Sequence, residues 1–149
     1  MTEGSAASGS AASEIEALRA SADAPDARAV QIAGLLSSLS TTLTVNHHLA
    51  DATAAEQAAV DILKAHTPNP EEIAAYRFAL ADSERELAVA LWAEQRDSDA
   101  LPVARAAVTD FRQAAGVADA RAVQIAGLLS SLSTTLTVNH HLADATAAE

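Results

Sequence analysis

Residues 26–56 read DARAVQIAGLLSSLSTTLTVNHHLADATAAE, and residues 119–149 read the same, letter for letter. The two copies lie 93 residues apart, and an identity of this length indicates a tandem duplication, natural or engineered. Apolar residues recur in this stretch at i, i+3, i+4 and i+7, which is the period of an amphipathic helix. The first apolar stripe comprises Ile32, Leu35, Leu36, Leu39 and Leu43, and the next comprises Leu49, Ala52, Ala55, Ala59 and Ile62.

A shorter period relates the middle of the chain to both copies. Ala52, Ala100 and Ala145 occupy equivalent places at spacings of 48 and 45 residues, and apolar segments flank each of them. Two amphipathic segments joined by a short polar link predict an antiparallel helical hairpin, so the chain is expected to be all-α. The expected units are 27–66, 71–115 and a truncated 120–149, with helices at 13–22, 27–46, 49–66, 71–95, 99–115, 120–139 and 142–149.

The first twelve residues differ from the rest in composition. They read MTEGSAASGSAA, which is typical of a flexible Gly/Ser/Ala leader, and a weak helical extension is the alternative.

Residues with special backbone preferences mark the predicted helix ends. Asn69 precedes Pro70 and two glutamates, which is the pattern of a capped helix with proline at its first position. Asp26 and Asp119 are expected to cap the two duplicated helices. Pro102 is expected in the first turn of its helix, where a missing N–H costs little.

The composition agrees with helices and narrows the class of partner. Half of the residues are hydrophobic while 3% are aromatic, and the chain has 5 glycines and 4 prolines. Ala and Leu supply most of the apolar content and are the best helix formers. The net charge of −11 disfavours nucleic acid and anionic membrane surfaces, because affinity for phosphates comes from clustered Lys and Arg. Basic or neutral proteins and peptides remain open as partners.

The absence of cysteine leaves neither a disulfide framework nor a thiolate metal site. Residues 1–13 contain no apolar core of a secretory signal. No apolar run approaches the roughly 18 residues that a membrane-spanning helix needs. The sequence therefore predicts a soluble, cytoplasmic protein without a cofactor.

Large and small residues alternate at fixed positions in each unit. The matching residues are Leu36, Leu39, Ser40, Leu43, Ala52 and Ala59 in the first unit, Leu87, Ala88, Leu91, Ala100 and Ala107 in the second, and Leu129, Leu132, Ser133, Leu136 and Ala145 in the third. This pattern resembles the tetratricopeptide repeat (TPR), in the longer-period form of kinesin light chains and bacterial sensor proteins. The resemblance covers about residues 13–149. It implies a right-handed α-solenoid of about two full units plus a truncated third.

Several positions depart from the family's motif. Glu84 stands where the motif opens with a large residue, and Glu56 stands at the large position of a second helix. His47 and Gln95 occupy the place of the usual turn glycine.

The resemblance also implies a binding surface, because stacked hairpins leave a continuous concave face that is lined by the first helix of each unit. Trp92 is the strongest candidate on this face, since tryptophan is enriched at binding hot spots, and packing between units is the alternative. The Lys and Asn that hold a peptide carboxylate in chaperone-binding members are absent from these positions. The candidate protein-binding residues are Ser37, Thr41, Thr44, Arg85, Val89, Trp92, Ser130 and Thr134.

Two histidine pairs and a hydroxyl-rich run invite a chemical function but fit a structural role better. Neighbouring side chains on a helix point about 100° apart, so His47-His48 and its copy His140-His141 are expected at helix ends and not on a metal ion. The serines and threonines of 37–44 lack the glycines of a nucleophile elbow. Their hydroxyls are expected to bond to the preceding helical turn.

The acidic clusters at 71–72 and 82–86 are expected to form a solvated face, with Arg77 and Arg85 near enough in sequence to pair with them. A catalytic acid needs burial or a close like charge that raises its pKa. We therefore expect neither catalytic residues nor metal ligands, and the sequence predicts a protein that is not an enzyme.

The last unit ends early by comparison with the first, since Glu149 is equivalent to Glu56. The apolar stripe of the helix at 120–139 is therefore expected to be partly bare. Residues 13–22 align with the closing half of a second helix, so the tail of one molecule is expected to contact the head of another in rings or filaments, or two tails to pair in a symmetric dimer. The expected self-association residues are Ile15, Leu18, Leu129, Leu132 and Leu136.

Two functional classes remain open on these grounds. The first is an interaction scaffold that binds a protein or peptide on its concave face and also forms a homo-oligomer. The second is a purely structural or engineered repeat protein whose partner is another copy of itself.

Overall fold

The computed structural model describes residues 3–22, 28–115 and 122–138. Over these residues the chain is all-helical, with six α-helices, one 3₁₀ turn and no strand. The helix predicted at 142–149, the aspartate caps at 26 and 119, and the histidines at 140–141 lie outside this part of the chain. The elements are α1 Glu3–Ala22, α2 Ala29–Val45, α3 Leu49–Ala65, η1 Pro70–Glu72, α4 Ile73–Ala93, α5 Asp97–Ala115 and α6 Ala122–Val138.

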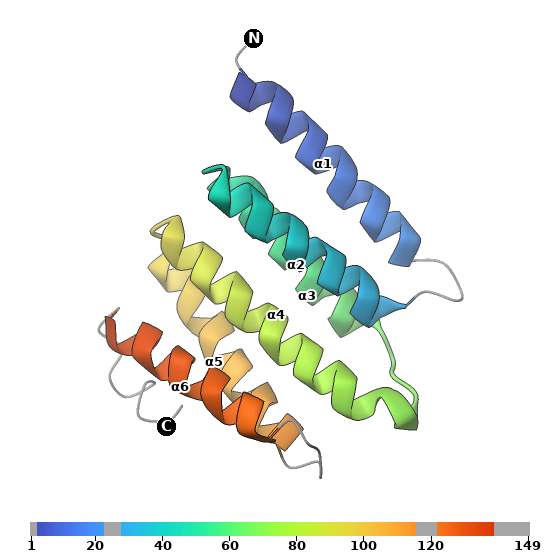
Figure 1. Cartoon of the computed structure of the whole chain (residues 1–149), viewed down its shortest axis with the longest axis vertical. Coiled ribbons are helices and arrows are strands. Elements are labelled where there is room, and N and C mark those ends of the chain that lie inside the picture. The colour runs from blue at the N-terminus through green and yellow to red at the C-terminus, as the bar shows by residue number, and fades with distance from the viewer. Residues whose placement is uncertain (1–2, 23–27, 116–121, 139–149) are drawn as a thin grey trace.

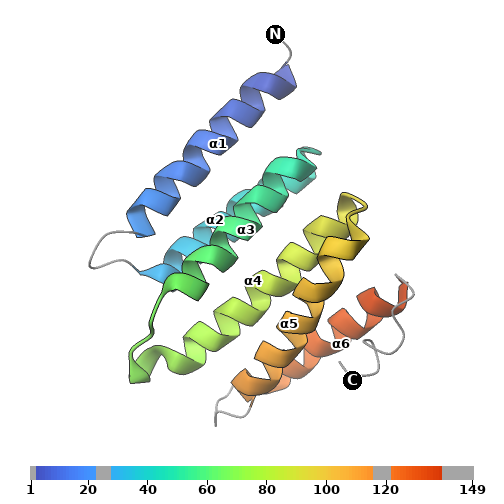
Figure 2. The same cartoon turned by 180° about the vertical axis from the view of Figure 1, so that it is seen from behind.

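The helices lie in two layers. Helices α2, α4 and α6 lie side by side on the face seen in Figure 1, and α3 and α5 lie behind them, as the reverse view in Figure 2 shows. The largest contacts join α2 with α3 and α4 with α5, which are the two predicted hairpins. Contact of α3 with α4 stacks one hairpin on the other, and α1 flanks the first hairpin through contacts with α2 and α3.

The two hairpins turn in the same way, 48 residues apart. His47 and Gln95 adopt the left-handed backbone, with φ of 62° and 60°. The N–H of His48 donates to the carbonyl of Leu43 at 2.8 Å, and Arg96 donates in the same way to Leu91 at 2.9 Å. This is the hydrogen-bond pattern of a Schellman helix end. The shorter period seen in the sequence therefore corresponds to a repeated turn.

The N-terminal helix corrects the expectation of a flexible leader. Helix α1 begins at Glu3, so the helical extension that was the alternative describes this segment. Ala11 is buried with Ile15 against α2 and α3, and Leu18 packs at the edge of the same cluster. A polar-looking segment becomes ordered because its few apolar residues share one face and find a partner surface.

The helix ends agree with the sequence at one site and differ at another. Asn69 and Glu72 form the reciprocal capping box before α4, with Pro70 at the first position, and the N–H of Asn69 donates to Glu72 Oε2 at 3.1 Å. Helix α5 begins at Asp97, two residues earlier than expected, so Pro102 lies inside the helix and not in its first turn. The carbonyl of Arg96 starts this helix by accepting the N–H of Ala100 at 3.0 Å.

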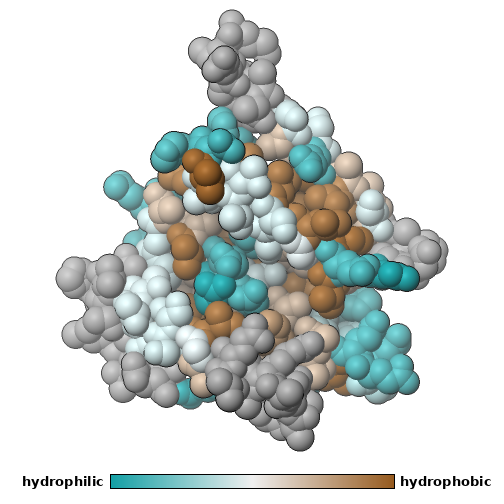
Figure 3. Space-filling view, viewed as in Figure 1, coloured by the Kyte–Doolittle hydropathy of each residue, from teal (hydrophilic) through white to brown (hydrophobic). Residues whose placement is uncertain are grey.

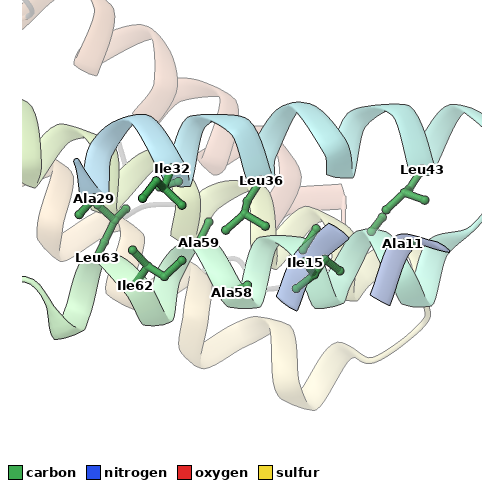
Figure 4. Packing of buried hydrophobic residues seen from close by; sticks show 13 residues of the cluster. Ala11, Ile15, Ala29, Ile32, Leu36, Leu43, Ala58, Ala59, Ile62 and Leu63 are labelled. Atoms are coloured by element: carbon green, nitrogen blue, oxygen red, sulfur yellow. The ribbon is translucent and has the colours of Figure 1, made fainter. Parts of the chain in front are cut away.

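The interior of the first hairpin is built from alanine and branched aliphatic side chains. Figure 4 shows Leu36 of α2 facing Ala58 and Ala59 of α3, with Ile15 entering from α1. Small side chains on α3 let the helices approach closely, and the aliphatic side chains fill the remaining space. A second cluster centred on the fully buried Phe111 joins α4, α5 and α6.

Helix α6 buries part of its apolar stripe within the single chain. Leu132 and Leu136 are buried within the single chain, in the cluster that α4 and α5 form, and Leu129 packs at its edge. At the other end of the molecule, Ile15 is buried in the cluster of the first hairpin and Leu18 packs against this cluster. Of the five side chains predicted for self-association, Ile15, Leu132 and Leu136 are thus buried within the chain, while Leu18 and Leu129 remain partly exposed.

Candidate functional site

A groove follows the seam between α2 and α4 on the face formed by the first helices of the hairpins. It consists of two hollows of about 220 and 280 Å³. The first includes Thr41, Thr44 and Val89, and the second includes Ser37 and Asp82. Figure 3 shows hydrophobic patches on this face around a compact hydrophilic patch.

Exposed valines line this groove. In the described part of the chain the exposed large apolar residues are Val30, Leu35, Val45 and Val89. Val45 and Val89, which are 72% and 40% exposed, line the first hollow, and Val30 lines the second. Isolated exposed apolar residues are ordinary, but here Val45 and Val89 share one hollow and Val30 lies in the other, so each hollow has an exposed apolar side chain.

Between the two hollows lies a buried carboxyl group. Glu56 of α3 is 1% exposed, and its Oε2 accepts a hydrogen bond from the Ser37 hydroxyl of α2 at 3.1 Å. Burial raises the pKa of Glu56 to about 7, and the negative charge of Glu86 on α4 adds to this effect. Hydrogen bonds from Ser37 and Ser40 oppose the rise. Near neutral pH this carboxyl therefore exchanges between the neutral and ionised forms.

An ion-pair cluster on α4 forms the wall of the groove beside Glu56. Arg85 donates to Asp82 Oδ1 at 3.0 Å and to Glu86 Oε1 at 2.5 Å, and its side chain is 18% exposed. The prediction that Arg85 pairs with the neighbouring carboxylates is thus confirmed. Asp82 and Glu86 each keep more than a third of their side chain exposed, so they give the groove an acidic rim.

A second buried carboxyl corrects the expectation that the acidic residues of 82–86 are solvated. Glu84 is 1% exposed, and one of its carboxyl oxygens is buried without a hydrogen-bond partner. Burial raises its pKa far above the ordinary range, and Asp110 of α5 adds to this through a hydrogen bond and its charge, while Lys64 of α3 opposes it. Glu84 is therefore neutral at pH 7 and joins α4 to α5 as a hydrogen-bonding acid.

Four of the eight predicted binding residues line the groove. Thr41, Thr44 and Val89 lie in the first hollow and Ser37 in the second. Arg85 is tied to carboxylates of both hollows. The remaining three residues lie elsewhere: Ser130 and Thr134 are exposed on α6, and Trp92 is half-buried against α5.

Trp92 is half-buried in the apolar clusters, and its hydrogen bond to Asp97 lies within the second hairpin and not between units. Its indole N–H donates to Asp97 Oδ1 at 2.8 Å across the hairpin turn, and its ring packs on the apolar clusters of α4 and α5. The indole therefore joins the two helices of the second hairpin.

The hydroxyl-rich run bonds to its own helix, as predicted. Ser38, Thr41 and Thr42 donate to the carbonyls four residues earlier at 3.1–3.2 Å, and Thr44 does so at 2.9 Å. Ser37 and Ser40 differ, because the Ser37 hydroxyl donates to Glu56 and Ser40 bonds to the same carboxyl.

The histidines of the first copy lie at a helix end. His47 is the left-handed residue of the turn and His48 precedes α3. Among the described residues no three His, Cys, Asp or Glu side chains are grouped so as to hold a metal ion. Within the same residues no helix has the length and apolarity to cross a membrane.

A further hollow of about 640 Å³ lies where α3 leads into α4, lined in part by Arg28, His66 and Tyr76. Its polar groups already pair within the chain. The Tyr76 hydroxyl donates to the carbonyl of Leu63, and His66 Nε2 lies 3.6 Å from Glu72 Oε2. These contacts stabilise the link between the two hairpins.

Comparison with known proteins does not relate this site to a protein family. No protein-family model, no curated protein and no solved structure matches the chain.

The residue that sequence reasoning missed at this site is Glu56. A signal for it was present, because Glu56 follows Ala52 by four residues and precedes Ala59 by three, and so lies within an apolar stripe. The same holds for Glu84. Both acids therefore lie on the apolar face of their helix, which faces the interior.

Proposed function

We propose that this chain is a TPR-like, right-handed α-solenoid that serves as an interaction scaffold, and that the α2–α4 groove binds an extended or helical peptide segment of another protein. The observation that carries the proposal is the exposure of Val45 and Val89 in one hollow of this groove and of Val30 in the other. Two hairpins with the same turn, stacked side by side, support the solenoid architecture.

The charge of the groove defines the class of partner. Asp82 and Glu86 rim the two hollows, and the chain carries a net charge of −11. Opposite charges at an interface steer association and exclude partners of the wrong sign. The favoured ligand is thus a segment with an aliphatic side chain for the valines and a Lys or Arg within one helical turn of it.

Self-assembly is the weaker of the two functions that the sequence left open. Copies with a charge of −11 repel each other, and three of the five residues predicted for their contact, Ile15, Leu132 and Leu136, are buried in the single chain. We therefore place the scaffold function first.

Selection from a random 12-residue peptide library at pH 7.5 tests the proposal. We expect enriched peptides to carry a Lys or Arg within four positions of Leu, Ile or Met. Val89→Asp places a charge in the apolar part of the groove and should weaken the selected peptides at least tenfold, which fluorescence anisotropy measures. Because Val89 is exposed, the melting temperature should stay within about 2 °C.

Leu35→Asp is the matched control. Leu35 is 57% exposed on the same helix as Val45 but lines neither hollow. It should leave peptide affinity within about twofold. A library that enriches no sequence, or an equal loss in both variants, would reject the groove as a binding site.

A further inference from the structure

The carboxyl of Glu56 lies at the meeting point of three helices. It comes from α3, is bonded to the Ser37 hydroxyl of α2, and faces the acidic wall of α4. When it is neutral, this side chain accepts the Ser37 hydroxyl of α2 without electrostatic repulsion from the carboxylates of α4. As an anion it brings a third negative charge next to Asp82 and Glu86, in a site where water screens poorly.

We propose that Glu56 is a proton-controlled switch of the α2–α4 groove, with the neutral carboxyl holding the seam closed and the ionised carboxylate loosening it. This inference rests on the proposed function for its biological use, since the seam that it controls is the proposed binding groove. The effect of Glu56 ionisation on the seam is itself a property of the chain without any ligand.

The charged groups around Glu56 determine the direction of the switch. From α4 it faces Glu86 and Asp82, both of which raise its pKa, and Arg85 is already paired with these two carboxylates. From α2 it faces the hydroxyls of Ser37 and Ser40. On the side of α3 toward α1, Asp61 pairs with Arg19 of α1 at 3.4 Å. Arg85 and Arg19 are therefore both already paired with carboxylates. Ionisation of Glu56 adds a negative charge that neither of them compensates.

The sign of the effect on stability follows from linkage. The folded pKa of Glu56, about 7, lies above its ordinary value of 4.5. A group of this kind is neutral in both states below pH 4.5 and costs nothing there. As the pH rises from 4.5 to 7 the unfolded chain loses the proton first, so the folded state loses stability. Above pH 7 the folded carboxyl ionises as well and the loss is complete.

Carboxyl ¹³C NMR of the free chain, compared with Glu56→Gln, tests the switch. The resonance that disappears in the variant should titrate near pH 7 in the wild type. Between pH 4.5 and 8 the unfolding equilibrium constant of the wild type should rise by up to about 300-fold relative to Glu56→Gln, which is the ratio of the two ionisation constants. Amide exchange in α2, corrected for its intrinsic pH dependence, should accelerate over the same range in the wild type and not in the variant.

Two further variants separate ionisation from simple loss of packing. Glu86→Gln removes a charge that raises the pKa of Glu56, so the titration should move to lower pH with the fold intact. Glu16→Gln on the exposed side of α1 should change neither the titration nor the exchange.

Titration of Glu56 near its ordinary value, or α2 exchange that is equally pH-dependent in Glu56→Gln, would overturn the switch. A failed peptide selection removes the proposed function and leaves this measurement valid. A failed titration removes the switch and leaves the peptide selection valid.

Discussion

At the scale of the residue, two glutamates define the interior of this molecule. Glu56 and Glu84 are both 1% exposed, and both lie within an apolar stripe of their helix. Burying an unpaired carboxylate costs free energy. Burial therefore raises the pKa of the carboxyl and keeps it neutral. Each acid then joins two helices by hydrogen bonding, Glu56 with Ser37 and Glu84 with Asp110.

Glu84→Leu tests this account away from the groove. Leucine extends the apolar stripe of α4 and removes the cost of keeping Glu84 protonated, so we expect stabilisation by about 2 kcal/mol at pH 8. The gain should shrink as the pH falls toward 4.5, where the carboxyl is neutral in the folded and unfolded chains alike. Urea unfolding at pH 5 and pH 8 measures both values. Equal gains at the two pH values would mean that packing alone, and not ionisation, distinguishes the variant.

At the scale of the element, the hairpin turn is the repeated unit. The left-handed residue that ends α2 is His47, and the one that ends α4 is Gln95. A residue with a Cβ is strained in this conformation, and glycine is not. The turn therefore forms because the helices on both sides pack, and it does so at a local cost.

Glycine at these two turns should stabilise the chain. We expect His47→Gly and Gln95→Gly each to contribute about 1 kcal/mol, because the left-handed backbone no longer opposes a Cβ. Thermal unfolding followed by circular dichroism measures the change. Ala54→Gly, at an exposed position inside α3, is the control and should cost about 1 kcal/mol. Destabilisation by the turn glycines would show that these side chains contribute contacts that outweigh the strain.

At the scale of the whole molecule, excess negative charge opposes compactness. The chain holds 20 acidic and 9 basic residues. The ion pair of Arg19 with Asp61, for example, lies on the surface, where a pair contributes little. Repulsion among the remaining carboxylates therefore dominates the electrostatics at neutral pH.

Salt should stabilise the protein for this reason. Raising the ionic strength from 10 to 150 mM shortens the Debye length from about 30 to about 8 Å, which screens the repulsion between distant carboxylates. We expect the melting temperature at pH 7.5 to rise by a few degrees, equally in NaCl and KCl. Differential scanning calorimetry measures the shift. A fall in melting temperature would mean that ion pairs such as those of Arg85, and not net charge, control stability.

The local structure was predictable from the sequence because its causes are local. Helical periodicity gave the six described helices to within a few residues at most ends, and the Asn69 cap and the hydroxyl bonds of Thr41 and Thr44 followed from neighbours within one turn. The start of α1 was missed because residues 3–12 lack an apolar pattern strong enough to outweigh their serines and glycines. Their order depends on contact with the first hairpin.

The identical helices α2 and α6 show what only the tertiary structure decided. They have the same 17 residues and the same bounds relative to the duplication. Nevertheless Leu36 is fully buried where its copy Leu129 is partly exposed, and Leu39 is partly exposed where its copy Leu132 is buried. Sequence determined that both segments are helices, because helical hydrogen bonds join residues four apart. Burial, the groove and the neutral state of Glu56 depend on which other helices lie alongside, and the letters of a segment do not contain that information.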